Sequence, residues 1–255
     1  HIFYRRRTVA SDDPRMGLQQ ALFAAADELP LDDPMQLRLG ALQKHREHNS
    51  ISFFHENAAR FRQQQDLIAG PERYATAVAA ALTSAATQRR QLALEIGPGE
   101  GWLLPRLSAL FDKVVALDNA AAMLEASRSS AARAQLENVE FVLGDTSIAA
   151  LDNLNADLVV INMVLHHTPD PALTLAQAAN CLSPGGVLLV TELCAHEQGW
   201  ARESCGDLWL GFEPQLIEDW ARAAGLEEFS SDYLAQRNGF TLQVRLFSAA
   251  HSALS

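Results

Sequence analysis

From Gln91 onward, short apolar runs alternate with amphipathic stretches, and this rhythm constrains the fold more than any other feature. The runs have the length of strands, and the stretches between them have helical spacing. Strands that are apolar throughout are typical of a parallel sheet covered by helices on both faces. We expect strands near residues 92–96, 114–118, 139–143, 157–162, 186–192, 227–233 and 240–248, and helices near 102–111, 120–134, 171–182 and 213–224.

The last two apolar runs are separated by the segment Gln236-Arg237-Asn238-Gly239. Asn-Gly is a strong hairpin signal, because both residues tolerate the left-handed backbone that a tight turn between strands requires. An antiparallel hairpin at the end of a doubly wound sheet is an uncommon combination. We therefore predict an α/β fold with a seven-stranded, mostly parallel sheet and a C-terminal antiparallel hairpin.

The first third of the chain has a different composition. Residues 1–9 look like the end of a strand, and helices rich in Ala, Gln, Arg and Leu are expected over 15–28, 34–68 and 71–88. We therefore divide the chain into an N-terminal strand remnant with a helical extension, residues 1–88, and a second domain, residues 89–255. The apolar positions of residues 34–68 need a partner surface, so we expect a homodimer formed through these helices.

Charge is distributed unevenly along the 255 residues, whose net charge is -11. Residues 1–90 hold 12 Lys and Arg against 10 Asp and Glu, whereas the remainder holds 8 against 21. A body this acidic repels phosphate, so we do not expect residues 91–255 to bind nucleic acid.

The three cysteines, Cys181, Cys194 and Cys205, have no repeated spacing, so we expect reduced thiols and a cytoplasmic location. No apolar run approaches the roughly 20 residues of a membrane span. The chain begins without Met inside an apparent strand, so we expect it to be a fragment of a longer protein.

The segment from Leu92 to Leu103 combines a strand, a glycine-rich loop and the start of a helix. The strand ends in Glu95, and Gly97, Gly99 and Gly101 follow, with Glu100 inside the loop. Glycines allow a tight turn and close approach of the backbone to a ligand. Two carboxylates make a poor phosphate site and a good site for a cationic ligand. The alternative is an ordinary turn between a strand and a helix.

Two further strands end in acids. Asp118 lies about 20 residues further along, where a ribose-binding acid belongs. It is followed by Asn119 and an Ala-rich helix, so Asp118 can also cap that helix. The third strand ends in Gly144-Asp145-Thr146, and Met123 is a candidate to pack on an adenine face. Because ligands of such sheets bind at the carboxyl ends of the strands, we expect the three acids to share one site.

These motifs resemble class I S-adenosylmethionine (SAM)-dependent methyltransferases of the type 11 small-molecule kind, over residues 91–248. The resemblance also covers Ile161–His167, Leu182–Gly186 and the closing hairpin. It implies a Rossmann-like fold, SAM as cofactor and S-adenosylhomocysteine (SAH) as product. By this resemblance Glu95, Gly97, Gly99 and Gly101 line the methionine moiety, Asp118 holds the ribose, and Asp145 holds the adenine. Asn162 and Val164 would offer backbone near the amino group or the sulfonium.

A second resemblance extends over nearly the whole chain. Gly206–Glu213 and the helix ending at Leu226 resemble bacterial proteins that fuse an arsenical-repressor-type winged helix to a methyltransferase. Phe53-Phe54 fits the linker of that group, and residues 1–9 resemble the last winged-helix strand. DNA would then be bound only through a winged helix upstream of this chain. An alternative function is therefore a SAM- or SAH-sensing module of a transcriptional regulator.

The acceptor side is expected near His166 and His167, which follow the fourth strand. One of them can act as general base for a small-molecule acceptor, or both can shape the loop before Thr168. We expect no metal, because two adjacent histidines without a carboxylate partner make a poor ligand set. The expected neighbours and roof of the acceptor pocket are Glu192, His196, Trp200, Trp209, Phe212, Phe53, Phe54 and Tyr74.

Two other chemistries fit the sequence less well. An NAD-dependent oxidoreductase is disfavoured by Glu100 in the loop and by the terminal hairpin. Arsenite methylation requires arranged thiolates, and Met163 stands where the arsenic methyltransferases that we would compare carry a cysteine.

Overall fold

A computed structural model describes residues 13–27, 29–57, 61–85 and 89–249. Contacts divide the chain into two compact units, residues 1–43 and residues 44–255. Residues 44–85, which the sequence-based division placed in the N-terminal extension, fall in the larger unit. The strand expected over residues 1–9 lies outside the described residues, and so the winged-helix interpretation stays a prediction.

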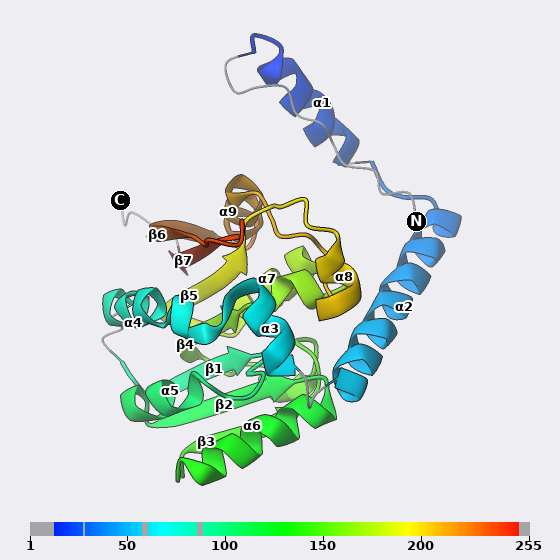
Figure 1. The fold of residues 1–255 in the computed structure, drawn as a ribbon. Helices are drawn as coiled ribbons and strands as arrows, with labels where there is room; N and C mark the ends of the chain where they lie inside the picture. Colours follow the sequence, from blue (N-terminus) through cyan, green and yellow to red (C-terminus); the bar gives the residue numbers. More distant parts are fainter. Residues whose placement is uncertain (1–12, 28, 58–60, 86–88, 250–255) are drawn as a thin grey trace, which may run out of the picture. The chain divides into compact units, whose positions relative to one another are not determined.

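The larger unit is built on the expected seven-stranded sheet, and its strand order is β3-β2-β1-β4-β5-β7-β6 (Figure 1). Strands β1 to β5 run parallel, and β7 is antiparallel to both β5 and β6. The reversal of strand order beside β1 places the carboxyl ends of β1, β2, β3 and β4 next to one another. The strands are β1 Leu92–Ile96, β2 Lys113–Asp118, β3 Val139–Leu143, β4 Ala156–Asn162, β5 Leu182–Leu193, β6 Leu226–Ala235 and β7 Thr241–Ala249.

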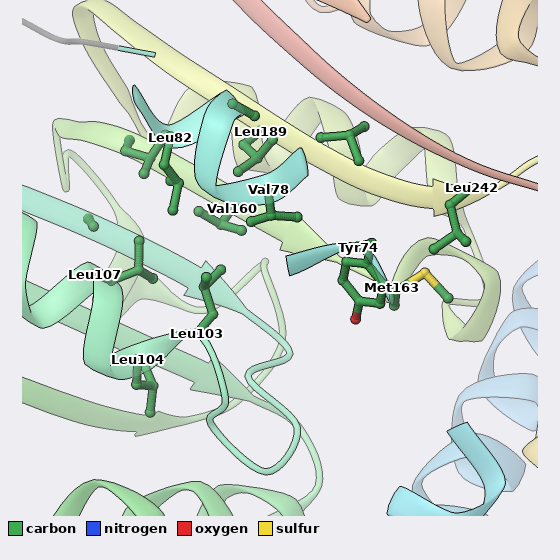
Figure 2. Close-up of a cluster of buried hydrophobic side chains, with 14 of the residues drawn as sticks. Tyr74, Val78, Leu82, Leu103, Leu104, Leu107, Val160, Met163, Leu189 and Leu242 are labelled. Atoms are coloured by element: carbon green, nitrogen blue, oxygen red, sulfur yellow. The ribbon is translucent and has the colours of Figure 1, made fainter. Parts of the chain in front are cut away.

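Each strand sends alternate side chains into two separate cores because successive side chains point to opposite faces. Ala93 packs into one core with helices α4 Ala75–Ser84 and α5 Leu104–Leu110, as Figure 2 shows for Val78, Leu82 and Leu107. Leu94, its neighbour in β1, packs into the other core with α7 Pro171–Asn180 and α9 Pro214–Ala223. Helix α6 Ala121–Arg133 packs on β2 and β3.

The helix expected over residues 34–68 is two helices in the structure, α2 Asp33–Asn57 and α3 Phe61–Ala69. Residues 58–60, between them, lie outside the described part. The acidic cap before Pro34 is present, because Asp32 Oδ1 accepts a hydrogen bond of 2.8 Å from the Met35 amide. In the smaller unit, α1 Met16–Asp27 and the start of α2 leave their leucines exposed.

Several boundaries differ from expectation, and one helix is new. Strand β5 begins at Leu182 rather than 186, because Leu182 pairs with Ala156 ahead of an irregularity in the β4–β5 register. The short helix α8 Trp200–Cys205 was not expected, and it ends at Gly206 in a left-handed conformation with φ 75°. Three 3-10 helices lie among the described residues, of which η2 Pro71–Arg73 and η4 Leu165–His167 matter for the site. None of the described helices is long and apolar enough to cross a membrane.

Candidate cofactor and acceptor site

Glu95 lies in β1 between Ala116 of β2 and Val160 of β4, near the carboxyl end of the sheet. Its side chain is 1% exposed, and its Oε2 has no hydrogen-bond partner among the described residues. Burial raises the pKa of Glu95 to about 8. A buried carboxyl without a partner destabilises the protein unless a ligand supplies one, so its retention at a strand end indicates a binding group.

The glycine loop follows Glu95 and packs closely on the loop after β4. Gly97 has a left-handed backbone, with φ 65°, and a Cβ there would lie 2.5 Å from Val164 Cγ2. Gly99 and Gly101 are also left-handed, with φ 58° and 76°. The absence of a side chain at Gly97 therefore lets Val164 approach the loop, so two residues that were expected at the cofactor lie in contact.

Asp118 ends β2 beside the glycine loop. Its Oδ1 accepts a hydrogen bond of 2.8 Å from the Ala120 amide, so it caps the turn before α6, and burial raises its pKa to about 6. Asn119 is exposed at the same turn. Asp118 is not the N-cap of α6 that the sequence offered as an alternative, because that position is Ala120; its side chain closes the turn that leads to the helix.

The end of β3 lies next to Asp118, because the Gly144 amide donates to the Asp118 carbonyl at 2.9 Å. The Asp145 side chain is exposed, and its Oδ1 accepts hydrogen bonds from the amide and the hydroxyl of Ser147. Thr146 donates its hydroxyl to Gln177 Oε1 at 2.5 Å. The structure thus brings the three strand ends together, while the Asp145 carboxylate faces its own turn.

Met123 is 2% exposed and packs with Ala120 and Phe54. This is the ordinary core role that the sequence offered as the alternative to adenine stacking.

Asn162 ends β4 on the other side of Glu95. Its amide donates to the hydroxyl of Tyr74 over 3.4 Å, while its Oδ1 is buried without a partner among the described residues. Tyr74 is 1% exposed, and burial raises its pKa to about 12. Two buried oxygens on the adjacent strands β1 and β4, one from the Glu95 carboxyl and one from the Asn162 amide, thus have no hydrogen-bond donor among the described residues. Both can accept hydrogen bonds from an ammonium group such as that of SAM.

The chain turns sharply after Asn162. Met163 has φ 58°, which is uncommon outside glycine and marks local strain of the kind that collects at functional sites. The turn leads into η4 and its two histidines. Met163 lies in the apolar core beside Tyr74 and also lines the cavity described below (Figure 2).

His166 and Glu192 form a buried pair. His166 Nδ1 lies 2.6 Å from Glu192 Oε1, with the side chains 3% and 0% exposed. Burial alone would lower the pKa of His166, but the charges of Glu192 and Asp207 outweigh it and raise the pKa to about 9. His166 is therefore positively charged at neutral pH and is held in one orientation.

His167 has the opposite character. Burial, reinforced by the charge of His166, lowers its pKa well below the usual value. Its Nδ1 lies 3.3 Å from the Gly206 carbonyl, and its own carbonyl accepts from Ser50 of α2. His167 is therefore a neutral imidazole beside a charged one.

A cavity opens beside the histidines, with about 300 Å³ of empty space including its part open to solvent. Both polar and apolar side chains line this cavity. Its lining residues are Gln65, Ile68, Ala69, Met163, His166, His167, Cys205 and Asp207. Asp207 was not expected from the sequence, because it follows the unforeseen helix α8 and lies 40 positions from His167.

Only some of the expected roof residues lie over this region. Phe54 contacts the His167 ring edge-on at 4.9 Å, and Phe53 contacts Phe54 at 5.6 Å. Trp209 donates to the Thr168 carbonyl at 2.8 Å. Phe212 instead packs in the core below, against Trp220, and Trp200 packs on Phe240 near the hairpin. His196 also contacts Phe240.

Comparison with known proteins identifies the part of the chain that holds Glu95, Asp118 and Asn162. Residues 94–190 match the family model of a methyltransferase domain. An uncharacterized methyltransferase of Mycobacterium bovis is 33% identical over 100 residues, which are 39% of this chain and 49% of that protein. The chain thus spans about half the length of this curated relative.

Solved structures share the fold at low identity. The N-methyltransferase NodS of Bradyrhizobium japonicum, solved with SAH, has a TM-score of 0.61 at 18% identity and covers 78% of this chain and 97% of its own. A SAM-dependent methyltransferase of Aquifex aeolicus has a TM-score of 0.56 at 16% identity, covering 75% and 97%. Residues 94–190 thus match a methyltransferase domain, within a chain that has the fold of SAM-dependent methyltransferases.

Proposed function

We propose that this protein transfers the methyl group of SAM to a small nucleophilic molecule. The observation that carries the proposal is Glu95, whose carboxyl is buried near the carboxyl end of β1 and whose Oε2 has no hydrogen-bond partner among the described residues. The unpaired Oδ1 of Asn162 on the adjacent strand supports the same assignment.

Each strand end would hold one part of the cofactor. Glu95 and Asn162 would accept hydrogen bonds from the ammonium group, and Asp118 would accept them from the ribose hydroxyls. The adenine amino group would be held by Asp145, whose carboxylate would leave its turn with Ser147. When bound, SAM supplies an electrophilic methyl group that needs no further activation.

The acceptor would lie in the cavity beside the histidine pair. His166 is engaged by Glu192, so the proton of a neutral acceptor would pass to His167, the uncharged partner. Phe53, Phe54 and Trp209 would restrict water there, which favours a reaction in which charge is lost. Beyond this, the protein needs to hold the nucleophile in line, about 3 Å from the methyl carbon.

Titration calorimetry with SAH and SAM tests the cofactor assignment. We expect one site per chain, and binding of SAH that displaces SAM. Absence of heat from both ligands at millimolar concentration, with the protein folded by circular dichroism, would overturn the proposal. Mass spectrometry of a panel of amines, phenols and thiols incubated with SAM then identifies the acceptor atom.

We also propose that the smaller unit mediates a homodimer. Leu18, Leu22 and Leu37 are 67%, 61% and 75% exposed, which is an unusual concentration of apolar surface for helices that face water. Light scattering should show a dimer that Leu22→Glu with Leu37→Glu dissociates. The matched change Leu173→Glu on α7, also at an exposed leucine, should leave it intact. A monomeric wild type contradicts the proposal.

A further inference from the structure

Three side chains of metal-ligating type converge in the cavity beside the cofactor region. His166 and His167 come from η4, and Asp207 comes from the turn after α8. One ligand atom from each of the three lies within 4.8 Å of the others. No metal was expected from the sequence, because the histidine pair had no carboxylate partner there. The fold supplies a carboxylate, Asp207, from a distant part of the chain.

The Asp207 carboxylate accepts no hydrogen bond from the described residues. The residue is 3% exposed, and both carboxylate oxygens are buried without a hydrogen bond among the described residues. The nearest ion-pair contact joins Oδ1 to His167 Nδ1 at 3.9 Å, which is too long for a hydrogen bond. A buried carboxylate that accepts no hydrogen bond lowers the stability of the folded protein unless its charge is neutralised. A cation between the carboxylate and the imidazoles would neutralise it.

The backbone holds Asp207 in place. The amides of Leu208 and Trp209 both donate to the His166 carbonyl, at 2.9 and 3.1 Å. Gly206 provides the left-handed turn before Asp207, and a Cβ there would lie 2.5 Å from Phe53 Cδ1. Main-chain hydrogen bonds therefore join the segment that carries Asp207 to the histidine segment, and they hold the carboxylate in place beside the two imidazoles.

Glu192 stands behind His166 in the arrangement that supports metal-binding histidines. A histidine ligand typically donates its other ring N–H to a carboxylate, which fixes the ring and makes the ligating nitrogen more basic. His166 Nδ1 is 2.6 Å from Glu192 Oε1, so Nε2 is the nitrogen that would bind the ion, and binding would release its proton.

From this geometry we propose that the cavity binds one divalent transition-metal ion through His166, His167 and Asp207. Two imidazoles and a carboxylate favour Zn²⁺ or Fe²⁺ over Mg²⁺ and Ca²⁺, which take oxygen ligands. Zinc is the better match, because three protein ligands with one open position are typical of its catalytic sites. Only three protein ligands are present among the described residues, so a coordination position stays open toward the cavity.

That open position suggests what the ion does, in a step that rests on the proposed function. An acceptor hydroxyl or thiol bound there would lose its proton to solvent more readily, because the ion stabilises the anion. The anion would form the new bond to the methyl carbon while the carbon–sulfur bond breaks and its electron pair stays on sulfur. His167 would then be a ligand instead of a base.

Metal binding can be measured without any activity. Tag-free protein stripped with a chelator is titrated with Zn²⁺ by calorimetry and with Co²⁺ by visible absorption. We expect one ion per chain. Asp207→Asn and His167→Gln should each weaken Zn²⁺ binding by roughly a hundredfold or more, and Glu192→Gln by about tenfold to a hundredfold. His48→Gln, at an exposed histidine on α2, is the matched control and should change nothing.

Several outcomes would overturn the metal site. These are no Zn²⁺ binding by folded wild type, equal loss in His48→Gln, or unchanged affinity in both Asp207→Asn and His167→Gln. Asp207→Asn removes an unpaired buried charge, so it should fold at least as well as wild type without metal, which thermal unfolding checks. SAH titration of the same stripped protein separates the two proposals: SAH binding without Zn²⁺ binding rejects the ion alone, and the reverse rejects the cofactor alone.

Discussion

Replacing Glu95 by Gln should weaken SAH binding by a factor on the order of a hundred, because the ammonium of the ligand loses a buried ionic partner. The amide keeps the shape of the side chain, so the fold should be preserved. Calorimetry on wild type and variant measures the ratio directly.

The same substitution should change how stability depends on pH. The pKa of Glu95 is raised to about 8 in the folded protein from its ordinary value of 4.5, so the unfolded chain binds fewer protons than the folded one between these values. Wild type therefore loses stability as pH rises through this range, whereas Glu95→Gln has no such group. The free energy of unfolding of the variant relative to wild type should rise by on the order of 3 kcal/mol from about pH 5 to about pH 9.

Glu137→Gln serves as the control, because Glu137 is an exposed carboxylate away from the strand ends. It should alter neither SAH affinity nor the pH profile. If Glu95→Gln binds SAH as wild type does, Glu95 is not the ammonium site. A flat stability difference across pH would show instead that Glu95 is ionised in the folded protein.

The parallel core of this fold could be predicted from sequence because its signal is local. The expected strands 92–96 and 139–143 coincide with β1 and β3, since each is an apolar run whose limits are marked by polar residues or glycine. Adjacency of the acid-bearing strand ends also follows from sequence, because the first three strands are neighbours in both common orders of a doubly wound sheet. Glu95 and Asp118 lie near the ends of adjacent strands, and their contact with a cofactor stays a prediction.

The acceptor side could not be predicted in the same way, because it is assembled from distant segments. Asp207 reaches the histidines through the turn after α8 and two main-chain bonds to His166, and no periodic pattern encodes these contacts. Tyr74 was expected as a lid, but it enters the core beside Asn162 because the segment before β1 packs on the sheet. The Asp145 carboxylate likewise accepts its hydrogen bonds within its own turn, from Ser147. Such local bonds compete with binding of a ligand, and the position of Asp145 at the strand end does not reveal them.

Gly97→Ala should destabilise the protein by about 2–5 kcal/mol and abolish measurable SAH binding. A left-handed backbone costs a residue with a Cβ about 1–2 kcal/mol. The new Cβ would also meet Val164 Cγ2 at 2.5 Å, so the glycine loop and the loop after β4 must separate. Overpacking of this kind adds about 1–3 kcal/mol. Chemical denaturation and SAH calorimetry measure the two effects.

Gly185→Ala isolates the backbone contribution. Gly185 has φ 79°, as left-handed as Gly97, but a Cβ there meets nothing within 4 Å. It should therefore lose only about 1–2 kcal/mol and keep full SAH binding. If Gly97→Ala proves as mild as Gly185→Ala, the close approach of Val164 to the loop does not constrain the site.

Val164→Ala completes the test, because it removes the two methyl carbons that the new Cβ would meet at 2.5 and 3.3 Å. In the double variant, the combined loss of stability should be smaller than the sum of the single losses by about 1 kcal/mol or more, as for any pair in direct contact. SAH binding should return in part, since the loop can close again. Additive losses would mean that Gly97 acts through its backbone angles alone, and the packing of the glycine loop on Val164 would then have no part in forming the cofactor site.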